Sequence, residues 1–155
     1  MNLQQAKKLA IEQMDKHGLL DLGWSFEYDN AKRRFGVCRY RPKVIGLSMP
    51  LVSANDEDRV MDTILHEIAH ALVGSGHGHN NVWKAKCSEI GAKPERCYTQ
   101  EDTNTIAGKY KAVCGGCGRV HSRHKRPMQG RRVACKCQAG IPWERKKVLE
   151  YAVAR

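Results

Sequence analysis

One segment near the middle of the chain constrains the fold most. Residues 56–74, DEDRVMDTILHEIAHALVG, place apolar side chains around most of a helical circumference, which is typical of a helix buried at the centre of a domain. The same segment carries His66, Glu67 and His70, and ionisable groups in such a place need partners. Ser53 and Asp56 have the spacing of a capping box and predict the start of this helix. The segment therefore predicts a central helix that holds a polar site.

The spacing of these three residues indicates a zinc site. His66 and His70 are four positions apart, so both imidazoles leave one face of the helix and can occupy adjacent corners of a tetrahedral zinc ion. Glu67 is then placed to take a proton from water without binding the metal, which is the chemistry of the H-E-x-x-H pattern. The alternative interpretation is two structural histidines beside an unrelated glutamate.

The third ligand must follow this helix. His77 comes one residue too late for the metzincin spacing, and His79 lies four residues before Trp83, at the entrance of another predicted helix. His79 and His77 therefore both stay open as ligands, and His77 could instead line the cleft. Asp62, one turn before His66, is a candidate partner for a ligand or a plain surface acid.

The remaining pattern of the first two thirds predicts an α+β domain. An amphipathic helix opens the chain, and candidate strands at 24–28, 35–39 and 44–48 suggest a small antiparallel sheet on which the helices pack. The composition changes to cysteine, glycine and basic residues in the last third. We place the boundary between 1–103 and 104–155.

A second metal site is predicted in this last third. Cys114, Cys117, Cys135 and Cys137 could bind a structural zinc ion as a ribbon, although the second pair is C-x-C rather than the usual C-x-x-C. His121 or His124 could replace one of these thiolates. The isolated Cys38, Cys87 and Cys97 are predicted to be buried thiols.

The ribbon carries all of the excess charge. Residues 1–103 hold 14 basic and 14 acidic residues, whereas residues 104–155 hold 13 basic residues against two glutamates, which accounts for the net charge of +11. This charge predicts sequence-independent binding to the backbone of DNA, either single-stranded or mixed single- and double-stranded, and the alternative is a solvated basic surface. The candidate contacts are Arg119, Arg123, Lys125, Arg126, Arg131 and Arg132.

A family resemblance is carried by DTILHEIAHALVG, by the following GHNNVWK, and by the strand segment that ends in IGLS. With these segments the chain resembles the SprT-like metalloprotease family, which includes the DNA-dependent protease Spartan. The resemblance implies a zincin-like domain over 1–103 and a zinc ribbon over 104–155. It assigns the catalytic zinc to His66, His70 and His79 and catalysis to Glu67. It also implies cleavage of DNA-bound proteins, as in the repair of DNA–protein crosslinks.

Two other functions remain open. One is a non-catalytic protein that binds zinc and nucleic acid, against which the retention of Glu67 argues; the other is a metallopeptidase without a DNA role. Tyr98, Tyr110 and His77 are candidates for stabilising an oxyanion. The odd number of cysteines, several of them in metal-like spacing, predicts a location inside the cell, in the cytoplasm, nucleoid or nucleus. The lack of an apolar stretch of roughly 20 residues predicts that there is no membrane partner. We also expect a monomer.

Overall fold

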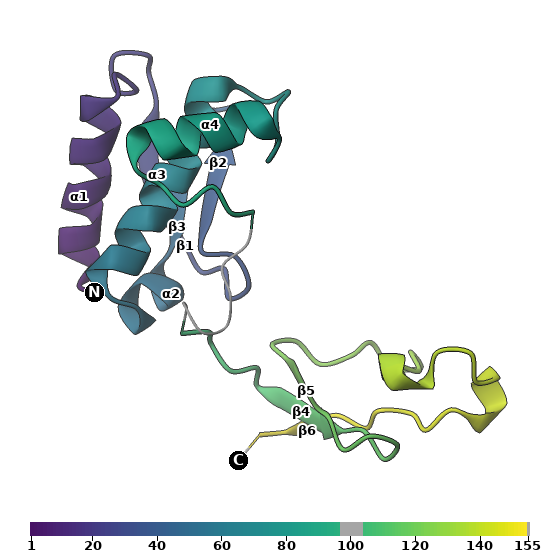
Figure 1. The fold of residues 1–155 in the computed structure, drawn as a ribbon. Helices are drawn as coiled ribbons and strands as arrows, with labels where there is room; N and C mark the ends of the chain where they lie inside the picture. The colour runs from purple at the N-terminus through teal and green to yellow at the C-terminus, as the bar shows by residue number, and fades with distance from the viewer. Residues whose placement is uncertain (97–103, 155) are drawn as a thin grey trace. The chain divides into compact units, whose positions relative to one another are not determined.

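The computed structural model describes residues 1–96 and 104–154 (Figure 1). The chain forms two compact units, Met1–Ile106 and Ala107–Arg155, and each has its own cluster of buried side chains. Within the described ranges, no helix is both long enough and apolar enough to cross a membrane. The mixture of helices and small sheets expected from the sequence is confirmed.

The described residues of the first unit form four helices and three strands. In chain order they are α1 (Leu3–Lys16), β1 (Ser25–Asp29), β2 (Gly36–Arg39), β3 (Val44–Ser48), α2 (Met49–Ala54), α3 (Glu57–Val73) and α4 (Asn81–Ile90). The three predicted strands are thus present, shifted by at most one residue at either end.

The prediction of an antiparallel sheet is wrong for one of its two strand pairs. The strand order is β1-β3-β2; β2 pairs with β3 in the antiparallel sense, whereas β1 runs parallel to β3. All five residues of β3 are buried, while β1 and β2 have more exposed side chains, so the most apolar strand takes the central position. The sheet is therefore mixed, and β2 is left as an edge strand.

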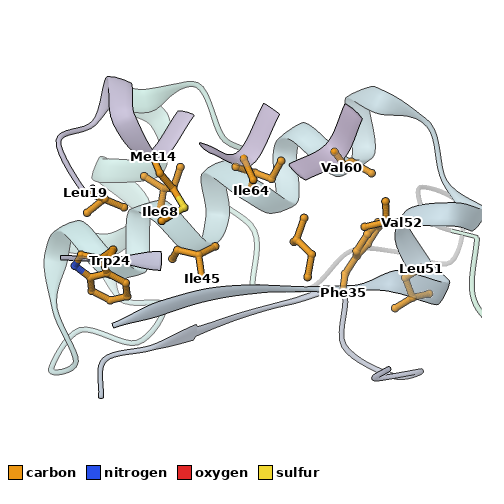
Figure 2. Close-up of a cluster of buried hydrophobic side chains, with 13 residues drawn as sticks. Met14, Leu19, Trp24, Phe35, Ile45, Leu51, Val52, Val60, Ile64 and Ile68 are labelled. Atoms are coloured by element: carbon orange, nitrogen blue, oxygen red, sulfur yellow. The ribbon is translucent and has the colours of Figure 1, made fainter. Parts of the chain in front are cut away.

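Helix α3 lies across this sheet and forms the core with it. Ile64 and Ile68 of α3 belong to one cluster of buried side chains with Ile45 of β3 and Met14 of α1, and Figure 2 shows this cluster around α3. All four side chains are fully buried. Because α3 is fixed on both sides by apolar packing, the polar residues on its remaining face are held in place.

The central helix begins later than the capping-box spacing predicts. Asp56 is the N-cap, and its carboxylate accepts a hydrogen bond from the backbone N–H of Arg59 at 2.9 Å. Ser53 belongs instead to the short helix α2, which ends because Asn55 and Asp56 adopt extended backbone conformations. Gly74 ends α3 with a positive φ of 85°.

The second unit is a small β structure. Its elements are β4 (Tyr110–Val113), β5 (Val120–Arg123), the 3₁₀ turns η1 (Lys136–Gln138) and η2 (Trp143–Arg145), and β6 (Ala152–Val153). Strands β4 and β5 form an antiparallel hairpin, and β6 pairs with the outer edge of β4. A small cluster that includes Ala112, Cys114, Cys135 and Leu149 forms the interior of this unit.

Candidate metal centres

Three histidines meet beside α3. His66 and His70 leave one face of this helix, as their spacing predicts, and His79 comes from the loop that precedes α4. Asn80 caps α4 by accepting hydrogen bonds from the backbone N–H groups of Val82 and Trp83. This cap fixes the entry into α4 and, with it, the position of the adjacent His79.

The ring nitrogens of these histidines have the spacing of zinc ligands. The Nε2 atom of His79 lies 3.2 Å from Nε2 of His66 and 3.2 Å from Nε2 of His70. Ligands at about 2.0–2.1 Å from a tetrahedral zinc ion are separated by about 3.3 Å, so the three donors fit one ion. Burial, followed by the neighbouring histidines, lowers the pKa of His66 to about 3 and that of His70 to about 4. Both rings are therefore neutral near pH 7, which is the form that binds a metal.

The indole ring of Trp83 packs against all three imidazoles. Its side chain is fully buried, and its ring centroid lies 4.7 Å from that of His66, 5.1 Å from that of His70 and 4.6 Å from that of His79. The His70 ring is stacked on the indole at an interplanar angle of 24°. The aromatic residue four positions after His79 thus restricts the rotamers of the whole donor set.

Glu67 points toward the sheet side of the same site. Its side chain is only 7% exposed, and burial raises its pKa to about 8, against the opposing effects of the Arg34 charge and the backbone N–H of Cys38. Gly36 on β2 makes this position possible, since a Cβ atom there would lie 2.6 Å from Glu67 Oε1. A carboxyl group with this pKa can both accept and return a proton near neutral pH.

Tyr40, which the sequence did not indicate, donates hydrogen bonds to carbonyl groups at the end of α3. Its hydroxyl lies 3.2 Å from the carbonyl oxygen of His70 and 3.3 Å from that of Gly74. Gly36 was likewise missed. The only signal for either residue was its position in or directly after a strand of the predicted sheet, which does not reveal the element it touches.

The three histidines and Glu67 line a cleft of about 650 Å³, together with Tyr40 and β2. His77 is not part of this donor set; its Nδ1 lies 3.3 Å from the side-chain nitrogen of Asn80. Asp62 does not support a histidine, because its carboxylate accepts hydrogen bonds from Arg59 at 2.7 Å and from the backbone N–H of Lys93 at 2.8 Å. Of the other oxyanion candidates, Tyr98 lies outside the described residues and Tyr110 belongs to the second unit. Cys97, predicted to be a buried thiol, also lies outside the described residues.

The four cysteines of the second unit also converge. Sγ of Cys114 lies 3.6 Å from that of Cys137, and Sγ of Cys117 lies 3.8 Å from that of Cys135. Zinc–sulfur bonds of about 2.3 Å require about 3.8 Å between thiolates, so this set also fits one zinc ion. Backbone N–H groups of Cys117 and Gly116 lower the pKa of Cys114 to about 6, which favours the thiolate form.

In the shortened C-x-C pair, Cys135 directly precedes η1 and Cys137 lies within it. Both thiols belong to the sulfur cluster, and neither His121 nor His124 does. Cys38 and Cys87 lie outside both clusters. Cys87 is fully buried and Cys38 is half-buried, and burial raises the pKa of each thiol to about 12.

A model of the SprT-like family matches residues 2–105. The chain belongs to the SprT-like family. Protein SprT of Glaesserella parasuis serovar 5 (strain SH0165) is 30% identical over 116 residues, which are 68% of this chain and 74% of that protein. Protein SprT of Pseudomonas putida (strain W619) is 27% identical over 114 residues, 67% of this chain and 70% of that protein. The family resemblance inferred from the histidine motif is thus confirmed, and it points to a metalloprotease-like protein.

The SprT-like match ends before the basic residues of the second unit. Lys125, Arg126 and Arg131 are exposed on the loop between β5 and η1, and the guanidinium of Arg132 lies 5.6 Å from the ring centroid of Trp143. Arg119 and Arg123 instead line a pocket beside β5. The six predicted nucleic-acid contacts therefore fall into a loop group and a pocket group.

Proposed function

We propose that this SprT-like protein is a zinc-dependent endopeptidase that cleaves proteins bound to DNA. The observation that carries the proposal is the convergence of three neutral imidazoles, at a spacing suited to zinc, beside a buried carboxyl group with a raised pKa. A purely structural metal site has no use for such a carboxyl group. Membership of the SprT-like family supports the same chemistry.

His66, His70 and His79 would hold the catalytic zinc ion, and Cys114, Cys117, Cys135 and Cys137 a structural one. A zinc ion at the histidine site supplies Lewis acidity, which polarises a peptide carbonyl and makes a water molecule more acidic.

Glu67 acts on the proton. Its carboxylate takes a proton from the attacking water, keeps it in a buried position, and gives it to the nitrogen of the departing amine. Trp83 and Tyr40 act by position: the first packs against the three imidazoles, and the second lies at the carbonyl groups that end α3. The cleft of about 650 Å³ is open to an extended peptide segment.

The DNA part of the proposal rests on the basic second unit. Thirteen basic residues and two glutamates in residues 104–155 favour contact with a polyanion, and binding to the same DNA would raise the local concentration of a DNA-bound protein substrate. Substrate choice would then come largely from proximity rather than from the cleft.

The test is a cleavage assay with the zinc-loaded full chain and a basic DNA-binding protein as substrate, in the presence and absence of single-stranded DNA. The proposal predicts fragments that require both the DNA and the metal, and none after chelation. Equal cleavage without DNA would retain the peptidase and refute the DNA role. No cleavage by a folded protein with two zinc ions per chain would favour a non-catalytic binding protein.

A further inference from the structure

A small basic pocket lies in the second unit, between β5 and the segment that leads to β6. It has a volume of about 380 Å³, and its cations come from Arg119, Arg123 and Lys136. None of the described residues that line it is acidic. Among the described residues, every ion pair lies within residues 8–89, so no carboxylate neutralises these three cations. The pocket is therefore a concentrated positive site without an internal counterion.

The strand period places this charge on one side of the hairpin. Arg119, His121 and Arg123 are alternate residues, so their side chains share one face at and just before β5. All three line the pocket. The rest of the lining is mainly apolar and includes Leu149 and Tyr151. A regular strand thus aims two guanidinium groups and an imidazole at a single concavity.

Arg123 is held in an orientation suited to an anion. Its guanidinium carbon lies 5.1 Å from the ring centroid of Tyr151. A guanidinium that rests on an aromatic face keeps its in-plane N–H groups available, and these can contact two oxygens of one phosphate. Tyr151 is therefore a positioning residue for Arg123.

The pocket also contains an unsatisfied polar atom. Nε2 of His121 is buried and has no hydrogen-bond partner among the described residues. A buried polar group without a partner is destabilising unless a ligand or a water molecule provides one. The sequence offered His121 as a zinc ligand, but the structure leaves it in this pocket rather than at the sulfur cluster.

We propose that this pocket binds one phosphate group of a single-stranded nucleic acid, with Arg119, Arg123 and Lys136 as its cationic contacts. The inference rests on the proposed nucleic-acid role and deepens it. Three cations that converge on a small concavity suit the tetrahedral oxygens of a phosphate better than a planar carboxylate. The exposed Lys125, Arg126 and Arg131 nearby in the chain provide charge for further phosphates of a strand.

The decisive test compares two variants that keep the charge. Arg123→Lys removes a guanidinium group from the pocket, and Arg145→Lys makes the same change at an exposed position of the same unit that does not line the pocket. Binding of a labelled single-stranded oligonucleotide to the zinc-loaded full chain is measured over a salt titration. Arg123→Lys is expected to weaken binding about tenfold, and Arg145→Lys to leave it unchanged. Equal affinity of both variants and the parent would overturn the pocket while leaving the DNA role intact.

Tyr151 gives a second comparison. Tyr151→Leu should weaken binding through loss of the aromatic face under Arg123, and Tyr151→Phe should restore it. A mononucleotide competitor distinguishes a phosphate of a nucleic-acid strand from a free nucleotide as the ligand. If the mononucleotide displaces the oligonucleotide only at a large molar excess, the strand is the ligand. If the mononucleotide binds as tightly as the oligonucleotide, the proposal of a strand is refuted. Preference for an acidic peptide over the oligonucleotide would also refute it.

A measurement with inorganic phosphate tests the pocket without DNA. Saturable shifts of the His121 ring resonances in nuclear magnetic resonance spectra, absent in Arg123→Lys, are expected even if no oligonucleotide binds. If the protein shows these shifts but does not bind the oligonucleotide, the nucleic-acid role is refuted and the phosphate pocket is retained. Absence of the shifts would refute the phosphate pocket.

Discussion

Replacement of Glu67 by glutamine should change how the stability of the metal-free protein depends on pH. Burial raises the pKa of the folded carboxyl group to about 8, compared with 4.5 for an ordinary glutamate. Between these two values the folded state retains the proton and the unfolded state releases it, so the glutamate makes stability fall as pH rises through this window. Glutamine keeps the shape of the side chain and removes the titration.

The size of the effect follows from this shift. Between about pH 5 and pH 7 the unfolded carboxyl group ionises while the folded one stays largely protonated, and each pH unit contributes about 1.4 kcal/mol. After allowance for partial ionisation at the lower pH, the free energy of unfolding of the parent should fall by about 2 kcal/mol relative to Glu67→Gln over this range. His66 and His70, whose pKa values are lowered, act in the opposite direction but cancel in the difference between the two proteins.

The assay is urea denaturation of the chelated full chain, followed by tryptophan fluorescence at several pH values. Trp24 and Trp83 are buried in the first unit, whereas Trp143 in the second unit is 41% exposed, so the signal reports mainly on the first unit. Glu57→Gln, at the exposed start of the same helix, controls for the substitution itself. Parallel stability curves for the parent and Glu67→Gln from pH 5 to pH 7 would refute the buried, proton-retaining carboxyl group.

Three further results are expected. His79→Ala should reduce the zinc content, measured by plasma mass spectrometry, from two ions per chain to one, whereas His77→Ala should keep both; the reverse result would reassign the third ligand. Gly36→Ala should cost about 1–3 kcal/mol in urea denaturation and abolish cleavage without loss of zinc, because its Cβ would occupy the space of the Glu67 carboxylate, and full activity of this variant would contradict the site geometry. Cys38, whose pKa is raised to about 12 by burial, should resist iodoacetamide at pH 8 until the protein is unfolded; rapid labelling of the native protein, detected by mass spectrometry, would show that the thiol is accessible and ionised.

The sequence predicts those parts of the site that lie on one element. His66 and His70 follow from a four-residue spacing, and the helix that carries them follows from its apolar periodicity. The two cysteine pairs are likewise each local, one in the turn between β4 and β5 and one at η1, and their short spacings indicated a metal site. On the helix, the four-residue spacing fixes which side chains face one another.

Features that depend on contact between distant elements could not be predicted in this way. The central position of β3 and the parallel sense of its pairing with β1 become clear only when all three strands are assembled. The space that Gly36 leaves for Glu67 depends on contact between a helix and an edge strand 31 residues earlier, and nothing in either segment marks this contact. The same holds for the pocket around Arg123, because part of its lining comes from Leu149 and Tyr151, far along the chain.

The central claim is that Glu67 carries out proton transfer in peptide hydrolysis at the histidine site. The most direct measurement compares the cleavage rates of the parent, Glu67→Gln and Glu57→Gln, each confirmed to hold two zinc ions per chain. Loss of a general base typically lowers the rate by about 10²–10⁴-fold, so Glu67→Gln should show a loss in this range while Glu57→Gln retains the parental rate. Cleavage by zinc-loaded Glu67→Gln at the parental rate would contradict the claim.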